Sequence, residues 1–169
     1  MVEIKCMQLT GRTEHWFVKP KHLISDLVTR INGVTNDDVA NAPSIGEIKD
    51  EVLSCLAGCS IIGHNVGVEV NILKRSFTGY IPTAAFDTLN LSKNLMPSLQ
   101  SYSLKNVGEE LGLTSKATML SQGKHHSALF DATLTALVFL RLLKPFNEIE
   151  MRAALNRSDI MYEPQMKLF

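Results

Sequence analysis

The sequence predicts a layered α/β domain. A short apolar strand at residues 60–63 stands between two segments with helical spacing, and a second strand at 83–86 runs directly into another helix. Nearly every position from 128 to 143 is apolar, which indicates a helix buried on most of its surface. With 169 residues, 45% of them hydrophobic, the chain is long enough to bury one such core.

The N-terminal part of the chain predicts a hairpin followed by short helices. Residues 2–9 alternate between apolar and polar, residues 10–12 form a turn signal, and residues 14–18 resemble a second strand. Residues 22–31 predict a weak helix or a loop. Either Thr35 or Asn36 is able to cap a short helix after it.

Capping residues and glycines mark the ends of the helices that follow. These marks are a Ser44–Glu47 capping box, Gly58, Asp87, Ser103 and Gly112. Between them, residues 66–77 and 88–96 predict helices. Residues 114–124 are polar without periodicity and predict a surface loop, and residues 146–169 predict a charged tail with one helical turn near 148–155.

Composition narrows the class of protein. The 17 basic and 17 acidic side chains cancel, so no overall field attracts nucleic acid or a membrane, although a small cleft can still bind nucleic acid locally. The three cysteines have no regular spacing and indicate free thiols in a reducing compartment, hence a cytoplasmic location. We expect no signal peptide and no membrane-spanning helix.

Acidic and imidazole side chains stand where strands pass into helices, the edge at which ligands bind in α/β sheets. For Asp131, on the apolar helix, we favour a metal-binding carboxylate over a solvent-facing or hydrogen-bonded one, because lone buried charges are rare. His126 suits a general base, but alone it is more often a loop histidine. Glu69 alone is more often a surface charge.

Two further positions near these strand ends have simpler explanations. Asp87 is better explained as a helix cap than as a ligand. His64 and Asn65 either fix the turn from strand to helix or contact substrate, and the sequence leaves both possibilities open.

Four stretches of the chain form a further pattern. They are Ile31-Asn32-Gly33-Val34-Thr35 with Ala42-Pro43, His64-Asn65-x-x-Val68-Glu69-x-x-x-Leu73, Phe86-Asp87-Thr88-Leu89 with Tyr102-Ser103-Leu104 and Leu111-Gly112-Leu113, and His126-x-Ala128-x-x-Asp131-Ala132. In their order and spacing these stretches resemble the DEDDh-type 3′–5′ exonucleases over about residues 1–143. The last stretch is the most specific.

This resemblance implies a ribonuclease-H-like mixed sheet flanked by helices, and hydrolysis of phosphodiester bonds with two Mg²⁺ or Mn²⁺ ions. It assigns Asp131 as a metal ligand and His126 as the general base, and it places Glu69 where the family has aspartate. His64 and Asn65 become substrate-binding candidates. The substrate implied is the 3′ end of single-stranded DNA or RNA.

The sequence departs from the family at its start. The family begins with a central strand that carries Asp-x-Glu, whereas residues 2–9 resemble its second strand, and Glu3 fits that second pattern. Loss of a central strand exposes pairing edges. The chain is then a fragment or shortened product, a domain that another chain completes, or a degenerate relative that binds without cutting.

We therefore expect an exonuclease-like domain at residues 1–145 and a tail at 146–169, with activity impaired because two carboxylates stand in place of four. The alternative is a non-catalytic module on the same fold that binds nucleic acid or a protein, including a partner or second subunit that completes the sheet. A weaker alternative is an unrelated α/β domain with structural carboxylates.

Overall fold

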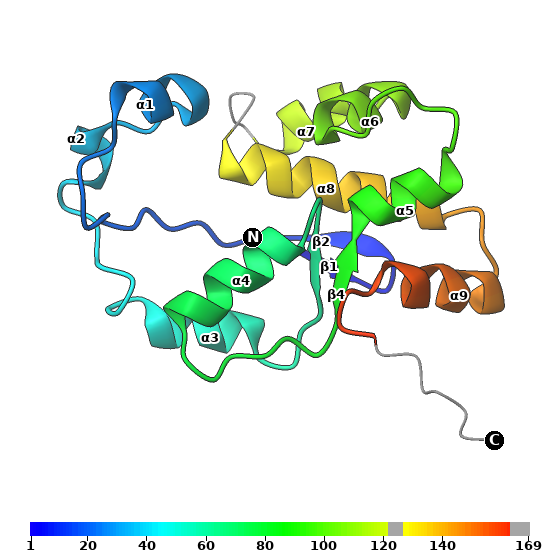
Figure 1. The fold of residues 1–169 in the computed structure, drawn as a ribbon, viewed down its shortest axis with the longest axis horizontal. Helices are drawn as coiled ribbons and strands as arrows, with labels where there is room; N and C mark the ends of the chain where they lie inside the picture. Colours follow the sequence, from blue (N-terminus) through cyan, green and yellow to red (C-terminus); the bar gives the residue numbers. More distant parts are fainter. Residues whose placement is uncertain (122–126, 163–169) are drawn as a thin grey trace.

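The computed structural model describes residues 1–121 and 127–162, and helix α8 (Ala128–Leu143) runs through the middle of the molecule (Figure 1). Helices α6 and α7 lie on one side of α8, and the strands lie on the other. The structure confirms the predicted bounds of α8. The Ser127 hydroxyl caps it by accepting a hydrogen bond from the Phe130 backbone N–H at 3.2 Å.

The described residues form two small sheets and a series of mostly short helices. The strands are β1 (Val2–Lys5), β2 (Gln8–Thr13), β3 (Ile61–Gly63) and β4 (Ala85–Asp87). The other helices are α1 (Asp26–Asn32), α2 (Asn36–Val39), α3 (Lys49–Leu56), α4 (Gly67–Ser76), α5 (Thr88–Leu95), α6 (Leu104–Glu110), α7 (Thr114–Ser121) and α9 (Glu148–Ser158).

The N-terminal hairpin is present, but its turn is not where the sequence predicted it. Strands β1 and β2 pair antiparallel around Cys6 and Met7, which both have positive φ angles, of 49° and 57°. Two such residues are typical of a tight two-residue hairpin turn. Gly11, expected in the turn, lies inside β2 with φ +83°, where the register with β1 shifts as a β-bulge.

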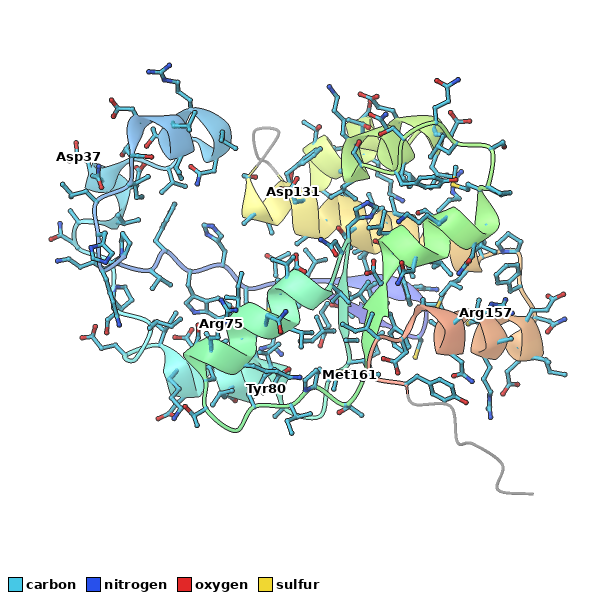
Figure 2. All side chains as sticks on the ribbon, viewed as in Figure 1. Asp37, Arg75, Tyr80, Asp131, Arg157 and Met161 are labelled. Atoms are coloured by element: carbon cyan, nitrogen blue, oxygen red, sulfur yellow. The ribbon has the colours of Figure 1, made fainter. Side chains whose placement is uncertain are left out.

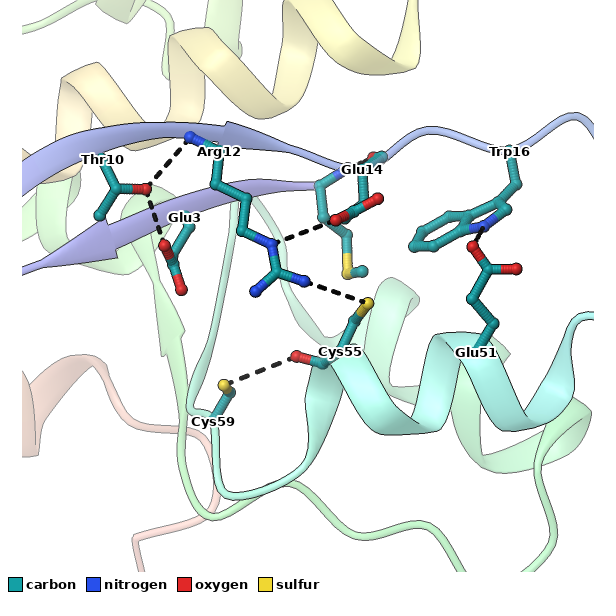
Figure 3. Close-up of polar contacts among 9 residues, drawn as sticks. Glu3, Thr10, Arg12, Glu14, Trp16, Glu51, Cys55 and Cys59 are labelled. Atoms are coloured by element: carbon teal, nitrogen blue, oxygen red, sulfur yellow. Dashed lines mark hydrogen bonds and ion pairs between the residues drawn. The ribbon is translucent and has the colours of Figure 1, made fainter.

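The strand predicted at residues 14–18 is wrong, since no ladder forms there. Only Glu14 pairs, exchanging backbone hydrogen bonds with Met1. Beyond it, Trp16 donates from its indole N–H to a Glu51 carboxylate oxygen on α3 at 2.8 Å, and Trp16 packs on the small core of α3 (Figure 3). This contact ties the segment to a helix instead of a sheet.

A polar cluster joins the hairpin to α3 (Figure 3). The Arg12 guanidinium forms an ion pair with Glu14 at 3.1 Å and lies 4.0 Å from the Cys55 sulfur, while Glu3 accepts from the Thr10 hydroxyl at 2.7 Å. All three cysteines are free thiols, as predicted. The carboxylate of Glu3 therefore serves a contact within the hairpin.

Most of the helix caps that the sequence predicted are present in the structure. Thr35 forms a capping box with Asp38 on α2, Asp87 caps α5 and Ser103 caps α6. Glu47 accepts a hydrogen bond from the Ser44 backbone N–H at 2.7 Å, but α3 begins only at Lys49, so that prediction placed the start of the helix too early. Gly58 follows α3 with φ +69°, as expected.

Two helices were underestimated in the sequence. The segment predicted as a loop forms α7, because Ala117 is fully buried and Leu113 beside it is nearly so, both within the main core around α8. The single turn expected near 148–155 is the eleven-residue helix α9, which packs on α5 and buries Ala154, only 1% exposed, in the main core. Neither α7 nor α9 shows strong amphipathic spacing in the sequence.

The core gathers around α8, whose buried side chains meet α5, α6, α7, β1 and β3. The α8 residues Leu134, Val138 and Leu143 are each at most 1% exposed. After α9, Asp159 forms an antiparallel bridge with Phe86 and covers the outer edge of β4. None of the described helices is long and apolar enough to cross a membrane.

Candidate functional site

Strands β3 and β4 run parallel, with Gly63 opposite Asp87, so their carboxyl ends meet at one edge. A cleft of about 980 Å³ opens there between β3, α4, α6 and α8. Four of its lining side chains are charged, and they are Glu69, Lys105, Glu109 and Asp131. Of the site residues that the sequence placed on separate segments, His64, Glu69 and Asp131 therefore line one cleft.

His64 follows β3 and lines the cleft, but both of its ring nitrogens are engaged. Nε2 lies 2.7 Å from the Tyr102 carbonyl oxygen, and Nδ1 lies 2.9 Å from the Thr88 hydroxyl. Because a carbonyl oxygen only accepts, Nε2 carries a hydrogen. His64 therefore fastens β3 to the start of α5 and to the segment before α6.

Asn65 turns the chain from β3 into α4 with φ +71°, a conformation that asparagine tolerates better than most residues. Its backbone N–H donates to Asp87 Oδ1 at 3.0 Å, and the same oxygen accepts from the Leu89 backbone N–H at 2.8 Å. Asp87 is 5% exposed. The structure confirms Asp87 as a helix cap, and one carboxylate oxygen thus holds both strand exits in place.

Glu69 lies in the first turn of α4 with its side chain reaching the cleft. Partial burial raises the pKa of its carboxyl above the usual value for glutamate, and the negative charge of Asp87 raises it further, while its own backbone N–H and His64 oppose the shift. A carboxyl with a raised pKa binds protons more readily and becomes a full anion only at higher pH.

Asp131 lies in the first turn of α8, near the N-terminal end of that helix (Figure 2). Its backbone N–H donates to the Ser127 carbonyl at 3.0 Å, and its side chain is half-buried. The sequence suggested a helix apolar all round, but the Asp131 side of the first turn borders the cleft. Asp131 therefore keeps contact with solvent and lines the same cleft as Glu69.

The proposed general base, His126, lies outside the described residues. Within residues 1–121 and 127–162, no group of three or more His, Cys, Asp or Glu side chains is arranged to hold a metal ion. Glu69 and Asp131 offer two carboxylates in one cleft. This number fits Mg²⁺, which is usually held by one or two carboxylates together with waters and substrate phosphates.

Sequence reasoning missed the groups that support this edge. Thr88 is fully buried; its hydroxyl lies 3.0 Å from the Gly63 carbonyl, to which it donates, and contacts His64. Lys105 and Glu109, which line the α6 wall, were also overlooked. The spacing of four residues between them was the available signal, because it places both on one face of α6.

Comparison with known proteins finds an exonuclease family model and DNA polymerase III proteins that are similar to this chain. The exonuclease family model of the RNase T type matches residues 1–139. The PolC-type DNA polymerase III of Thermotoga maritima is 35% identical over 157 residues, which cover 88% of this chain and 11% of that protein. The DNA polymerase III subunit epsilon of Aquifex aeolicus is 28% identical over 131 residues, or 75% of this chain and 61% of that protein.

Two solved structures share the fold. Exonuclease X in complex with 5′ overhanging duplex DNA superposes with a TM-score of 0.67 at 22% identity, covering 91% of this chain and 87% of that one. A structure of histone mRNA stem-loop recognition by a 3′-exonuclease gives 0.65 at 18% identity, over 82% and 66%. The chain spans only 11–12% of the first two PolC-type relatives.

Proposed function

This chain belongs to the RNase T family of DEDDh-type 3′–5′ exonucleases, and from that membership we propose that its cleft takes the 3′ end of single-stranded DNA or RNA. Its fold is the ribonuclease-H-like α/β fold that the sequence predicted. The observation that carries the proposal is the placement of Glu69 on α4 and Asp131 on α8 in one cleft.

In this proposal Glu69 and Asp131 hold Mg²⁺ or Mn²⁺. When bound, the ions supply positive charge that stabilises the attacking and leaving oxygens of phosphodiester hydrolysis. The raised pKa of Glu69 makes ion binding weaken as the pH falls, because a protonated carboxyl is a poor ligand. His126 is the proposed base that takes the proton of the attacking water.

The proposed substrate contacts come from the β3 exit. The Asn65 side chain is exposed beside the start of α4. Since the ring nitrogens of His64 are engaged with Thr88 and Tyr102, a substrate would meet the ring of His64 and not its nitrogens. We propose residues 1–145 as the unit that carries the site, with residues 146–169 following it and α9 packed on α5.

We propose that hydrolysis by this chain alone is impaired, because two carboxylates stand where the family uses four. The alternative is a non-catalytic module on the same fold that binds nucleic acid or a protein. A partner strand or second subunit that completes the sheet remains part of the proposal. Its support is that β1 and β3 each pair with one strand in the described structure and that both contact α8.

Incubation with labelled oligonucleotides tests the proposal. Single-stranded DNA and RNA labelled at the 5′ end are incubated with Mg²⁺ or Mn²⁺, beside Asp131→Asn, Glu69→Gln and the matched control Asp50→Asn, an exposed carboxylate on α3. Ion-dependent shortening from the 3′ end, lost in the first two variants and kept in the control, supports the nuclease. Binding without shortening supports the non-catalytic module, and no binding refutes both.

A further inference from the structure

The cleft carries more negative than positive side chains, which is unfavourable for binding a polyanionic substrate. Its described lining carries the carboxylates of Glu69, Glu109 and Asp131, and apart from the imidazole of His64 its only basic side chain is Lys105. We propose that Lys105 contacts a backbone phosphate of the bound strand and that Glu109 is a competing partner that this phosphate displaces. This inference rests on the proposed function and deepens it.

Lys105 stands on a wall that is fixed to the helix of Asp131. It lies in the first turn of α6, whose cap is formed by the Ser103 hydroxyl, which accepts from a backbone N–H at 3.3 Å. The following residues Val107 and Gly108 are buried, and Gly108 lies directly against Leu134 of α8. Leu134 follows Asp131 by three residues on α8. The backbone that carries Lys105 is therefore held at a fixed distance from the backbone that carries the Asp131 carboxylate.

The Lys105–Glu109 contact is weak enough to be exchanged. Its nitrogen and oxygen are 4.0 Å apart, and the two side chains are 68% and 53% exposed. Exposed ion pairs of this kind contribute little to stability, since water screens the charges and holding two long side chains costs entropy. A phosphate that enters the cleft can therefore displace Glu109 from Lys105 at little cost in free energy. A lysine ammonium binds it as a compact point charge.

Salt dependence separates a phosphate contact from other effects. Each phosphate neutralised on a single strand contributes about 0.7 to the slope of log affinity against log salt. We expect Lys105→Met to bind a labelled single-stranded oligonucleotide several-fold more weakly at low salt. Between 50 and 200 mM salt the wild type should lose about 2.6-fold more affinity than the variant. Fluorescence anisotropy in EDTA measures this without hydrolysis.

Glu109→Gln has the opposite expected effect, because it releases Lys105 and removes a repulsive charge. Affinity should rise with the slope unchanged, and the gain should be clearly smaller in the double variant with Lys105→Met, where only the repulsive charge is removed. A gain of equal size in the double variant refutes the role of Glu109 as a competing partner. Arg152→Met, which removes the cation of the exposed Glu148–Arg152 pair on α9, is the matched control and should change nothing.

The inference and the proposed function fail in different ways. If the wild type binds no oligonucleotide either in EDTA or with Mg²⁺ or Mn²⁺, the proposed function is wrong. If the wild type binds but Lys105→Met keeps its affinity and slope, the assignment of Lys105 is wrong while the function stands. Circular dichroism of each variant verifies that the fold is intact, as expected for exposed side chains.

Discussion

Replacing Gly108 by alanine tests the contact between α6 and α8. An added Cβ would lie 2.8 and 2.9 Å from the two terminal carbons of Leu134, and 3.2 Å from its Cγ. Ordinary carbon contacts are about 3.5–4.0 Å, so something must move by several tenths of an ångström. Leu134 is only 1% exposed and has little room to yield.

Two effects of opposite sign determine the result. Alanine is favoured over glycine inside a helix by about 0.8–1.0 kcal/mol. Overpacking a filled core costs about 1–3 kcal/mol. We therefore expect Gly108→Ala to lower the free energy of unfolding by about 1 kcal/mol. Urea denaturation followed by circular dichroism measures this as a lower midpoint with an unchanged m-value.

Gly67→Ala on α4 is the matched control. Its Cβ would meet only Ile160 Cδ1, at 3.9 Å, so the gain in helix propensity should appear without a clash. The double variant Gly108→Ala with Leu134→Val gives the second test, because the shorter side chain makes room for the methyl group. We expect a favourable coupling of about 0.5–2 kcal/mol. If Gly108→Ala is as stabilising as Gly67→Ala, the reasoning is refuted.

Three further predictions concern the site. Asp87→Ala should lower the free energy of unfolding by about 2–3 kcal/mol in urea, because two backbone donors lose their acceptor, and Asp87→Asn should lower it less. Ser127→Ala should cost about 1 kcal/mol in thermal unfolding through the lost cap of α8, with an unchanged midpoint counting against that cap. The Glu69 carboxyl has a folded pKa above its unfolded one, so the stability it confers is full below about pH 4.5 and is lost as the pH rises through the folded pKa. The stability of the wild type relative to Glu69→Gln should therefore fall from pH 4 to pH 7 in urea titrations, and a constant or rising difference would contradict the raised pKa.

Local signals in the sequence were sufficient to predict a helix where its cap and its end are set by residues within the helix or next to it. Helix α8 begins and ends as predicted because Ser127 caps it and its apolar run stops just before Pro145. The caps of α2, α5 and α6 were likewise readable, since each depends on a side chain within three residues.

Long-range contacts decided the elements that the sequence missed. Helix α7 forms because its few apolar positions, Ala117 above all, meet α8, and nothing in its own spacing signals that partner. The hairpin turn fell on Cys6 and Met7, two residues with no turn propensity, and Gly11, which the sequence placed in the turn, lies in the bulge of β2.

In the site, too, local signals were readable from the sequence and long-range contacts were not. Glu69 and Asp131 were identified from motif spacing, and the structure places both on one cleft. The double use of Asp87 Oδ1 and the engagement of both His64 nitrogens depend on groups more than twenty residues away. Spacing within one segment carries no information on such pairs.

The bridge between Phe86 and Asp159 also bears on self-association. Ile160 donates from its backbone N–H to the Ala85 carbonyl, and the Asp159 carboxylate accepts from the Ala85 N–H, each at 2.9 Å. These bonds occupy the outer edge of β4, which would otherwise be a template for edge-to-edge aggregation. The β3–β4 sheet can therefore lengthen only on its β3 side, so a chain that pairs there ends the assembly instead of seeding a fibre.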